Sequence, residues 1–82
     1  MNSREYLIEM RTQKGLTQRD ISKQLGISES YYNLIENGIR QKNMNVTTLY
    51  RLSKALQVSI TVLVDKEMNF IDSETLKWLS TH

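Results

Sequence analysis

The 82-residue sequence has no cysteine and no proline, and only three glycines, one tryptophan and one histidine. Without cysteine the chain can form neither disulfides nor thiolate metal sites, so we expect an intracellular, cytoplasmic protein. Because proline, low-complexity tracts and internal repeats are all missing, nothing indicates a linker or a second domain. His82 has no second histidine or cysteine to join it and is not expected to bind a metal.

Long hydrophobic runs are missing as well. The longest apolar run is far too short to span a bilayer, and the N-terminal stretch lacks the apolar core of a signal peptide. Hydrophobic residues still make up 39% of the chain and charged residues 24%, which is too apolar for a disordered protein. We therefore expect one small globular domain with no membrane partner.

Charge and residue types limit the possible functions. The net charge is +2, with seven basic and five acidic residues in 1–42 and four of each in 43–82, which only weakly favours a polyanionic partner. The chain has no cysteine nucleophile, no glycine-rich phosphate loop and no histidine within the predicted fold. Neither enzyme activity nor a cofactor is therefore expected.

The most informative stretch predicts two short helices. Thr17 is typical of a helix N-cap, and Asp20 three residues later completes a variant of the capping box. Ser28 repeats the cap signal eleven residues further on. We predict one helix over 18–25 and a second over about 29–37.

Gly26 separates these two helices. It follows Leu25 at a helix end, where a positive φ is commonly needed, and glycine adopts that φ without a Cβ clash. The remaining turn is three or four residues long, the length of the connection in DNA-binding helix-turn-helix motifs. A helix about 10–12 Å across fits the major groove, and a preceding helix can brace it against phosphates. The pair of helices therefore predicts DNA binding.

Apolar periodicity predicts further helices around this pair. One spans about 2–14 with Asn2 as its cap, and another spans about 46–56 behind Asn45. Residues 58–64 suit a strand, because many are β-branched, or a short buried helix, and we favour the helix.

The residues after Lys66 form a C-terminal extension, 67–82, with a last short helix predicted over 73–80 behind Asp72. So short a helix needs packing to be stable. The apolar residues from position 60 onward exceed what a small core needs, so we expect them to pair two copies of the chain, the alternative being packing on the first helix. The candidate dimerisation residues are Ile60, Val64, Phe70, Ile71, Trp78 and Leu79.

The segments GLTQRDISKQLGISESYYNLIENGIR and TLYRLSKALQVS resemble the helix-turn-helix family of phage repressors and Cro proteins, also called the xenobiotic-response-element (XRE) type. The resemblance covers about residues 4–65. It implies an all-α, five-helix, lambda-repressor-like bundle over 1–66 and a homodimeric transcription regulator, commonly a repressor, that binds near-palindromic operators in double-stranded DNA. Related folds also serve as antitoxins or co-regulators, so a module that binds a protein partner is the alternative.

Carried over by position, the resemblance implies roles for individual residues. Gln18 would contact a phosphate at the N-terminus of its helix, and Arg11 would form an internal ion pair with Glu36. The positions implied to read bases are Ser28, Glu29, Ser30 and Leu34. The positions implied to touch the DNA backbone are Asn37 and Arg40, with Lys42 as a further cation of the same loop.

Several of these positions have a second reading. Glu29 could accept a hydrogen bond from cytosine N4 or be a solvated carboxylate in the first turn of its helix. Asn33 is a small polar residue able to bond a base or a phosphate, with solvent exposure as the alternative. Leu34 could meet a thymine methyl or pack on a loop. Tyr31 is expected beside the core with its hydroxyl free for a phosphate, whereas Tyr32 is expected inside the core.

Overall fold

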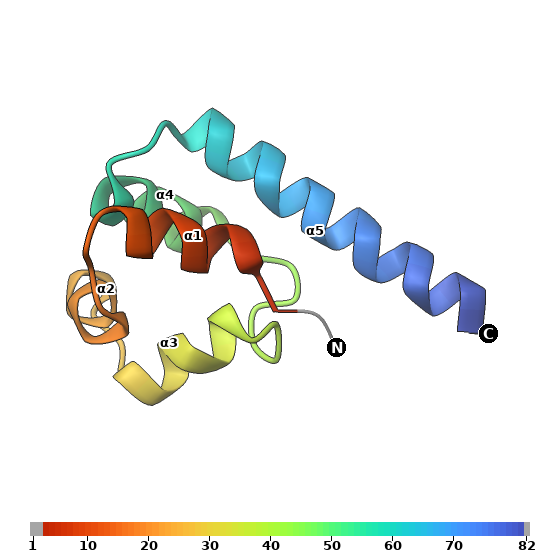
Figure 1. The fold of residues 1–82 in the computed structure, drawn as a ribbon, viewed down its shortest axis with the longest axis horizontal. Coiled ribbons are helices and arrows are strands. Elements are labelled where there is room, and N and C mark those ends of the chain that lie inside the picture. Colours follow the sequence, from red (N-terminus) through yellow and green to blue (C-terminus); the bar gives the residue numbers. More distant parts are fainter. Residues whose placement is uncertain (1–2, 82) are drawn as a thin grey trace.

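The computed structural model describes residues 3–81, and within this range the chain forms five α-helices and no strand. The helices are α1 Glu5–Gln13, α2 Gln18–Leu25, α3 Glu29–Glu36, α4 Val46–Leu56 and α5 Ile60–Thr81. The first four form a compact group, whereas α5 lies along one side of the group and runs on beyond it (Figure 1). The predicted all-α, five-helix architecture is therefore confirmed.

A single apolar core joins the helices. α2 packs on α3 and α4, α4 also packs on α5, and α1 packs on α3. Tyr32 is fully buried, as predicted. The core residues are Leu7, Ile21, Leu25, Tyr32, Ile35, Met44, Leu52, Ala55, Leu56 and Leu63.

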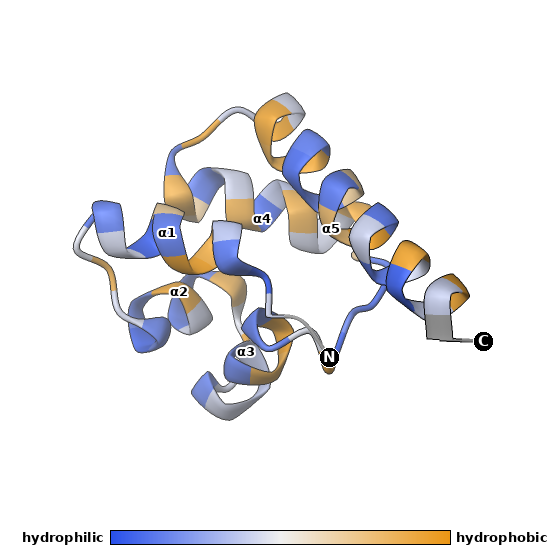
Figure 2. Ribbon diagram, turned by 45° about the vertical axis from the view of Figure 1, so that its right-hand side comes forward, coloured by the Kyte–Doolittle hydropathy of each residue, from blue (hydrophilic) through white to orange (hydrophobic). Residues whose placement is uncertain are grey.

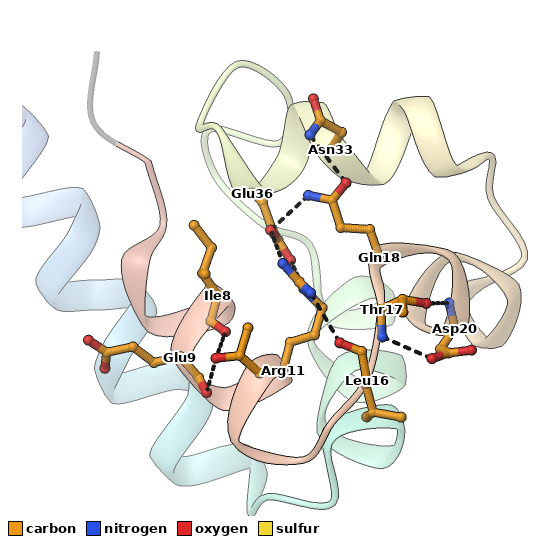
Figure 3. Close-up of polar contacts among 10 residues, drawn as sticks. Ile8, Glu9, Arg11, Leu16, Thr17, Gln18, Asp20, Asn33 and Glu36 are labelled. Carbon is orange, nitrogen blue, oxygen red and sulfur yellow. Dashed lines mark hydrogen bonds and ion pairs between the residues drawn. The ribbon is translucent and has the colours of Figure 1, made fainter.

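Local signals set the bounds of α2 and the start of α3. The Asp20 backbone N–H donates to Thr17 Oγ1 at 3.1 Å, and the Thr17 N–H donates to Asp20 Oδ2 at 2.8 Å (Figure 3). Gly26 ends α2 with a φ of 71°. Ser28 caps α3 by accepting from the Tyr31 N–H at 3.0 Å. The capping box, the glycine turn and the second cap are all as predicted.

The start of α1 differs from the prediction. The helix begins at Glu5 and not directly after Asn2, and Asn2 itself lies outside the described residues. Arg4 occupies the N-cap with a φ of −78° and a ψ of 76°, and its side chain makes no cap bond. Its backbone N–H instead donates to the Glu36 carbonyl at 2.6 Å. A tertiary contact therefore decides where α1 begins.

The C-terminal region also differs from the prediction. Residues 60–81 form one continuous helix, so the separate short helix over 73–80 behind Asp72 is wrong, and so is the strand alternative for 58–64. Ser59 caps the long helix by accepting from the Val62 N–H at 3.1 Å. The helix contains neither proline nor glycine to stop it, so it continues through the polar stretch after Lys66. Within the described chain, no helix is both long and apolar enough to cross a membrane.

Candidate nucleic-acid interface

An ion pair holds α3 against α1. Arg11 Nε donates to Glu36 Oε2 at 2.7 Å, and Arg11 Nη2 donates to Glu36 Oε1 at 3.2 Å (Figure 3). Arg11 Nη1 also donates to the Leu16 carbonyl at 3.0 Å. The hydrogen bond to Glu36 raises the pKa of Arg11, which keeps the guanidinium charged opposite the buried carboxylate. This is the internal ion pair that the resemblance implied.

A chain of amide side chains leads from this ion pair to the surface. Gln18 Nε2 donates to Glu36 Oε1 at 3.0 Å, and Gln18 Oε1 accepts from Asn33 Nδ2 at 3.2 Å (Figure 3). Asn33 Oδ1 in turn accepts from Asn37 Nδ2 at 3.0 Å. These contacts leave one N–H and one oxygen lone pair on each of Gln18 and Asn33 for a further partner. Gln18 is therefore a bridge between α2 and α3, a role that the sequence did not indicate.

The outer side of α3 is open. Glu29 and Ser30 are exposed, and Asn33 and Leu34 are half-buried. Together with Gln18 these residues line a shallow hollow formed by α2 and α3 alone. In Figures 1 and 2, α5 lies well away from the N-terminal half of α3. The tail of the chain therefore leaves this face uncovered.

The other predicted DNA contacts lie around this hollow. Ser28 is exposed, and its hydroxyl oxygen accepts from the Tyr31 N–H as the cap of α3. Tyr31 is half-buried and faces α4, where its hydroxyl accepts from Gln41 Nε2 at 3.5 Å. Arg40 and Lys42 are exposed on the loop beyond the C-terminal end of α3. In the structure Asn37 therefore lies beside Asn33, at the edge of the candidate site. Tyr31, Arg40 and Lys42 do not line the hollow.

The candidate dimerisation residues lie on α5 and divide into two groups. Ile60, Val64, Trp78 and Leu79 are exposed and Ile71 is half-buried. Phe70 packs inward, where its ring centroid lies 4.7 Å from Arg4 Cζ. Intrachain packing against the start of α1, the alternative reading, is therefore correct for Phe70. Figure 2 shows hydrophobic segments along α5 out to its C-terminal turns.

A second buried ion pair escaped the sequence analysis. Arg4 Nε donates to Glu67 Oε1 at 2.9 Å, with side-chain exposures of 0% and 4%. The Tyr6 hydroxyl donates to Glu67 Oε1 at 2.6 Å, and burial, followed by this hydrogen bond, raises the pKa of Tyr6. Only its spacing in the sequence indicated that Glu67 is buried: it lies four residues after Leu63, on the side of α5 that faces the core.

Comparisons with known proteins agree with this geometry. A helix-turn-helix family model matches residues 7–63. An uncharacterised HTH-type transcriptional regulator of Sinorhizobium fredii is 42% identical over 55 residues, which cover 67% of this chain and 69% of that protein. A second such regulator, of Bacillus subtilis, is 39% identical over 44 residues, which cover 54% of this chain and 58% of that protein.

Among solved structures, the restriction-modification controller protein C.AhdI from Aeromonas hydrophila has a similar fold. Its TM-score is 0.63 at 31% sequence identity, covering 71% of this chain and 85% of that chain. The family match spans α2, the glycine turn, α3 and the helices that support them. The chain therefore belongs to the XRE-type helix-turn-helix family of DNA-binding transcriptional regulators.

Proposed function

We propose that this protein is a sequence-specific repressor that binds a near-palindromic operator as a homodimer, with α3 in the major groove. The observation that carries the proposal is the open outer side of α3, where Glu29, Ser30, Asn33 and Leu34 line a hollow shared only with α2. The opposite side of α3 is held in the core by Tyr32. A rigid helix with one free polar side is what the major groove admits.

The side chains on this outer side offer different groups to base edges. The Ser30 hydroxyl can donate and accept, and Asn33 has one N–H and one lone pair left after its intramolecular bonds. Glu29 can accept from cytosine N4, and Leu34 can contact a thymine methyl. These four residues are therefore assigned to base contact.

Phosphate contacts are assigned to the two ends of the motif. Gln18 is the first residue of α2, where backbone N–H groups and the helix dipole favour an anion. Arg40 and Lys42 are exposed beyond the other end of α3. Contacts of this kind fix the register of the protein on the duplex.

Selection of bound duplexes from a random library tests the DNA contacts. Ser30→Ala and Asn33→Ala should each weaken binding at one base position, by about 1–3 kcal/mol against the selected base. Lys42→Ala should instead weaken all duplexes alike and lower the salt dependence. Failure to select any preferred duplex would contradict the proposal and favour a protein partner. A reporter driven through the selected site should lose expression when the protein is present.

The dimer is proposed to form through the outer side of α5. Spacings of four and seven residues place Ile60, Val64, Ile71 and Trp78 along one stripe of the helix. Trp78 is 58% exposed, a large apolar surface for a small domain to leave in water. To place two recognition helices in successive major grooves on one face of the duplex, the paired chains must hold them about 34 Å apart, one turn of DNA.

Sedimentation of the native protein and two alanine variants tests the dimer. Trp78→Ala should weaken self-association by about tenfold or more, because aromatic residues dominate such interfaces. Leu76 is the matched control: it is 67% exposed on the same helix but lies on a different side, so Leu76→Ala should leave association unchanged. A native protein that stays monomeric at high concentration would contradict this part of the proposal.

A further inference from the structure

Arg4 is fully buried where the N-terminal segment, the loop after α3 and α5 meet. Its Nε and Nη2 donate to the two carboxylate oxygens of Glu67, each at 2.9 Å. Its Nη1 donates to the carbonyls of Ile35 at 2.7 Å and Arg40 at 3.1 Å, and its Nη2 also donates to the Gln41 carbonyl. All five N–H groups of the guanidinium are thus used, in a fork geometry that lysine lacks.

The loop that Arg4 binds has an uncommon backbone conformation. Gln41 has a φ of 56°, in the left-handed region that residues other than glycine seldom adopt. Arg4 binds the carbonyls of Arg40 and Gln41, so it stabilises this conformation from inside the molecule. The side chains of Arg40 and Lys42 are exposed on the same loop. The buried arginine therefore fixes the backbone from which two exposed cations extend.

The other side of this junction is α5. Glu67 faces inward, and Phe70 covers the guanidinium at 4.7 Å. Val64 and Ile71 of the proposed dimer stripe lie on the same turns of α5. One buried arginine thus connects the loop after α3 to the helix on which two chains are proposed to pair.

We infer that Arg4 and Glu67 are positioning residues for DNA binding. They hold the loop after α3 so that Arg40 meets a phosphate, and they tie this loop to α5. The inference rests on the proposed function, which assigns Arg40 to the DNA backbone. Both residues are buried, so their effect on DNA binding is indirect, and the bonds from Arg4 to the Arg40 and Gln41 carbonyls direct it to the loop.

A double-mutant cycle tests this coupling, with the duplex that the native protein selects as the probe. Arg40→Ala should weaken binding by about tenfold in the native background, because one charged phosphate contact is lost. In the Arg4→Lys background the same change should weaken binding by less than about twofold, since the loop no longer presents Arg40. Arg4→Lys keeps the net charge, yet the slope of log affinity against log salt should become less steep, by the contribution of about one phosphate contact.

Arg11→Lys is the matched control, because it alters the other arginine–glutamate pair and leaves the loop carbonyls bound. In that background Arg40→Ala should keep its full tenfold effect. Equal Arg40→Ala effects in the Arg4→Lys and native backgrounds would overturn the inference. If Arg40→Ala has no effect on the native protein, the inference also fails, whereas the base contacts of α3 are judged separately by Ser30→Ala and Asn33→Ala.

A second variant guards against simple misfolding. Glu67→Gln keeps the shape of the side chain and one carbonyl acceptor for Arg4, and helical circular dichroism verifies that it is folded. It should reproduce the reduced Arg40→Ala effect and the reduced salt slope. A folded Glu67→Gln protein with native values of both would contradict the role of α5 in holding the loop.

Discussion

Two arginine–glutamate pairs hold this small domain together, and each pair joins different elements of the fold. Arg11 and Glu36 join α1 to α3, with 14% of the arginine side chain exposed, and lead through Gln18 towards the outer side of α3. Arg4 and Glu67 are almost completely buried and join the loop after α3 to α5. The residue types are the same, but the remaining N–H groups of Arg11 reach one backbone carbonyl, that of Leu16, whereas those of Arg4 reach three.

The difference shows how one helical bundle can support two separate surfaces, the outer side of α3 and the loop after α3 beside α5. A relay of amide side chains ends in groups that are free to meet another molecule, which suits the polar face of α3. A guanidinium whose five N–H groups are taken up by three carbonyls and a carboxylate fixes the path of the backbone and has no donor left for another molecule. The first pair is therefore expected to support the DNA-facing side of α3, and the second to matter for stability and for the placement of the loop.

The largest expected effect comes from removing each arginine. Arg4→Ala should lower the free energy of unfolding by about 3–5 kcal/mol, because Glu67 stays buried without its partner. Arg11→Ala should lower it by about 1–3 kcal/mol, since Glu36 retains the Gln18 bond and water can reach the site. Urea denaturation followed by circular dichroism measures both. Equal losses would remove the distinction between the two pairs.

The next effect comes from the third donor on each carboxylate. Tyr6→Phe removes the hydroxyl from Glu67, and Gln18→Ala removes the amide from Glu36. Each should lower stability by about 1.5 kcal/mol, the lower end of the range for a hydrogen bond to a charged group. Only Gln18→Ala should also weaken binding to the selected duplex, by several-fold. A loss of DNA affinity in folded Tyr6→Phe would contradict the separation of roles.

Alkaline pH should act on half-buried Tyr6 and buried Tyr32, which lie beside the two pairs. Burial, more than the neighbouring carboxylates, raises the pKa of Tyr6 and of Tyr32 above the ordinary value of 10.0. Their protonated forms are favoured in the folded state, so this contribution to stability is complete below about pH 10 and is lost as the pH rises further. Denaturation midpoints measured from neutral to alkaline pH should fall less steeply for Tyr6→Phe than for Gln18→Ala.

The smallest effect concerns the cap of α2, the helix that carries Gln18. Hydrogen bonds from the Thr17 backbone and hydroxyl lower the pKa of Asp20 below its usual value of 3.8. The cap therefore stabilises the fold above that value and loses its effect as the pH falls through the folded-state pKa. In Thr17→Ala, NMR titration should show the pKa of Asp20 rising only part of the way to the ordinary range, because the backbone N–H at position 17 still donates to the carboxylate. Thr17→Ala removes none of the groups that bind Arg4, so the Arg4 pair should keep its hydrogen bonds.

Short-range signals accounted for much of the fold. Thr17, Gly26 and Ser28 act within four residues of themselves, so the bounds of α2 and the start of α3 could be predicted correctly. The start of α1 could not be predicted in this way, because the Arg4 backbone is bonded to Glu36, 32 residues along the chain. The continuity of α5 was obscured by a misleading local signal, since Asp72 is a typical helix cap but lies inside the helix.

The candidate site was predictable to a similar degree. The resemblance supplied the Arg11–Glu36 pair, and helical periodicity separated buried Tyr32 from the open side that carries Ser30. The bridging role of Gln18 could not be predicted, because a polar residue at the start of a helix is ordinary and its partners come from α3.

The sequence by itself determined the all-α fold, the two-helix motif and its outward face, because caps, a glycine turn and the 3.6-residue period act locally. Only the tertiary structure decided that Arg4 lies inside the molecule with the Phe70 ring packed on its guanidinium, while Trp78 remains 58% exposed. The physical reason is that a buried charge is tolerated only where distant segments together supply all of its hydrogen bonds. No local pattern in the sequence indicates that these distant segments come together.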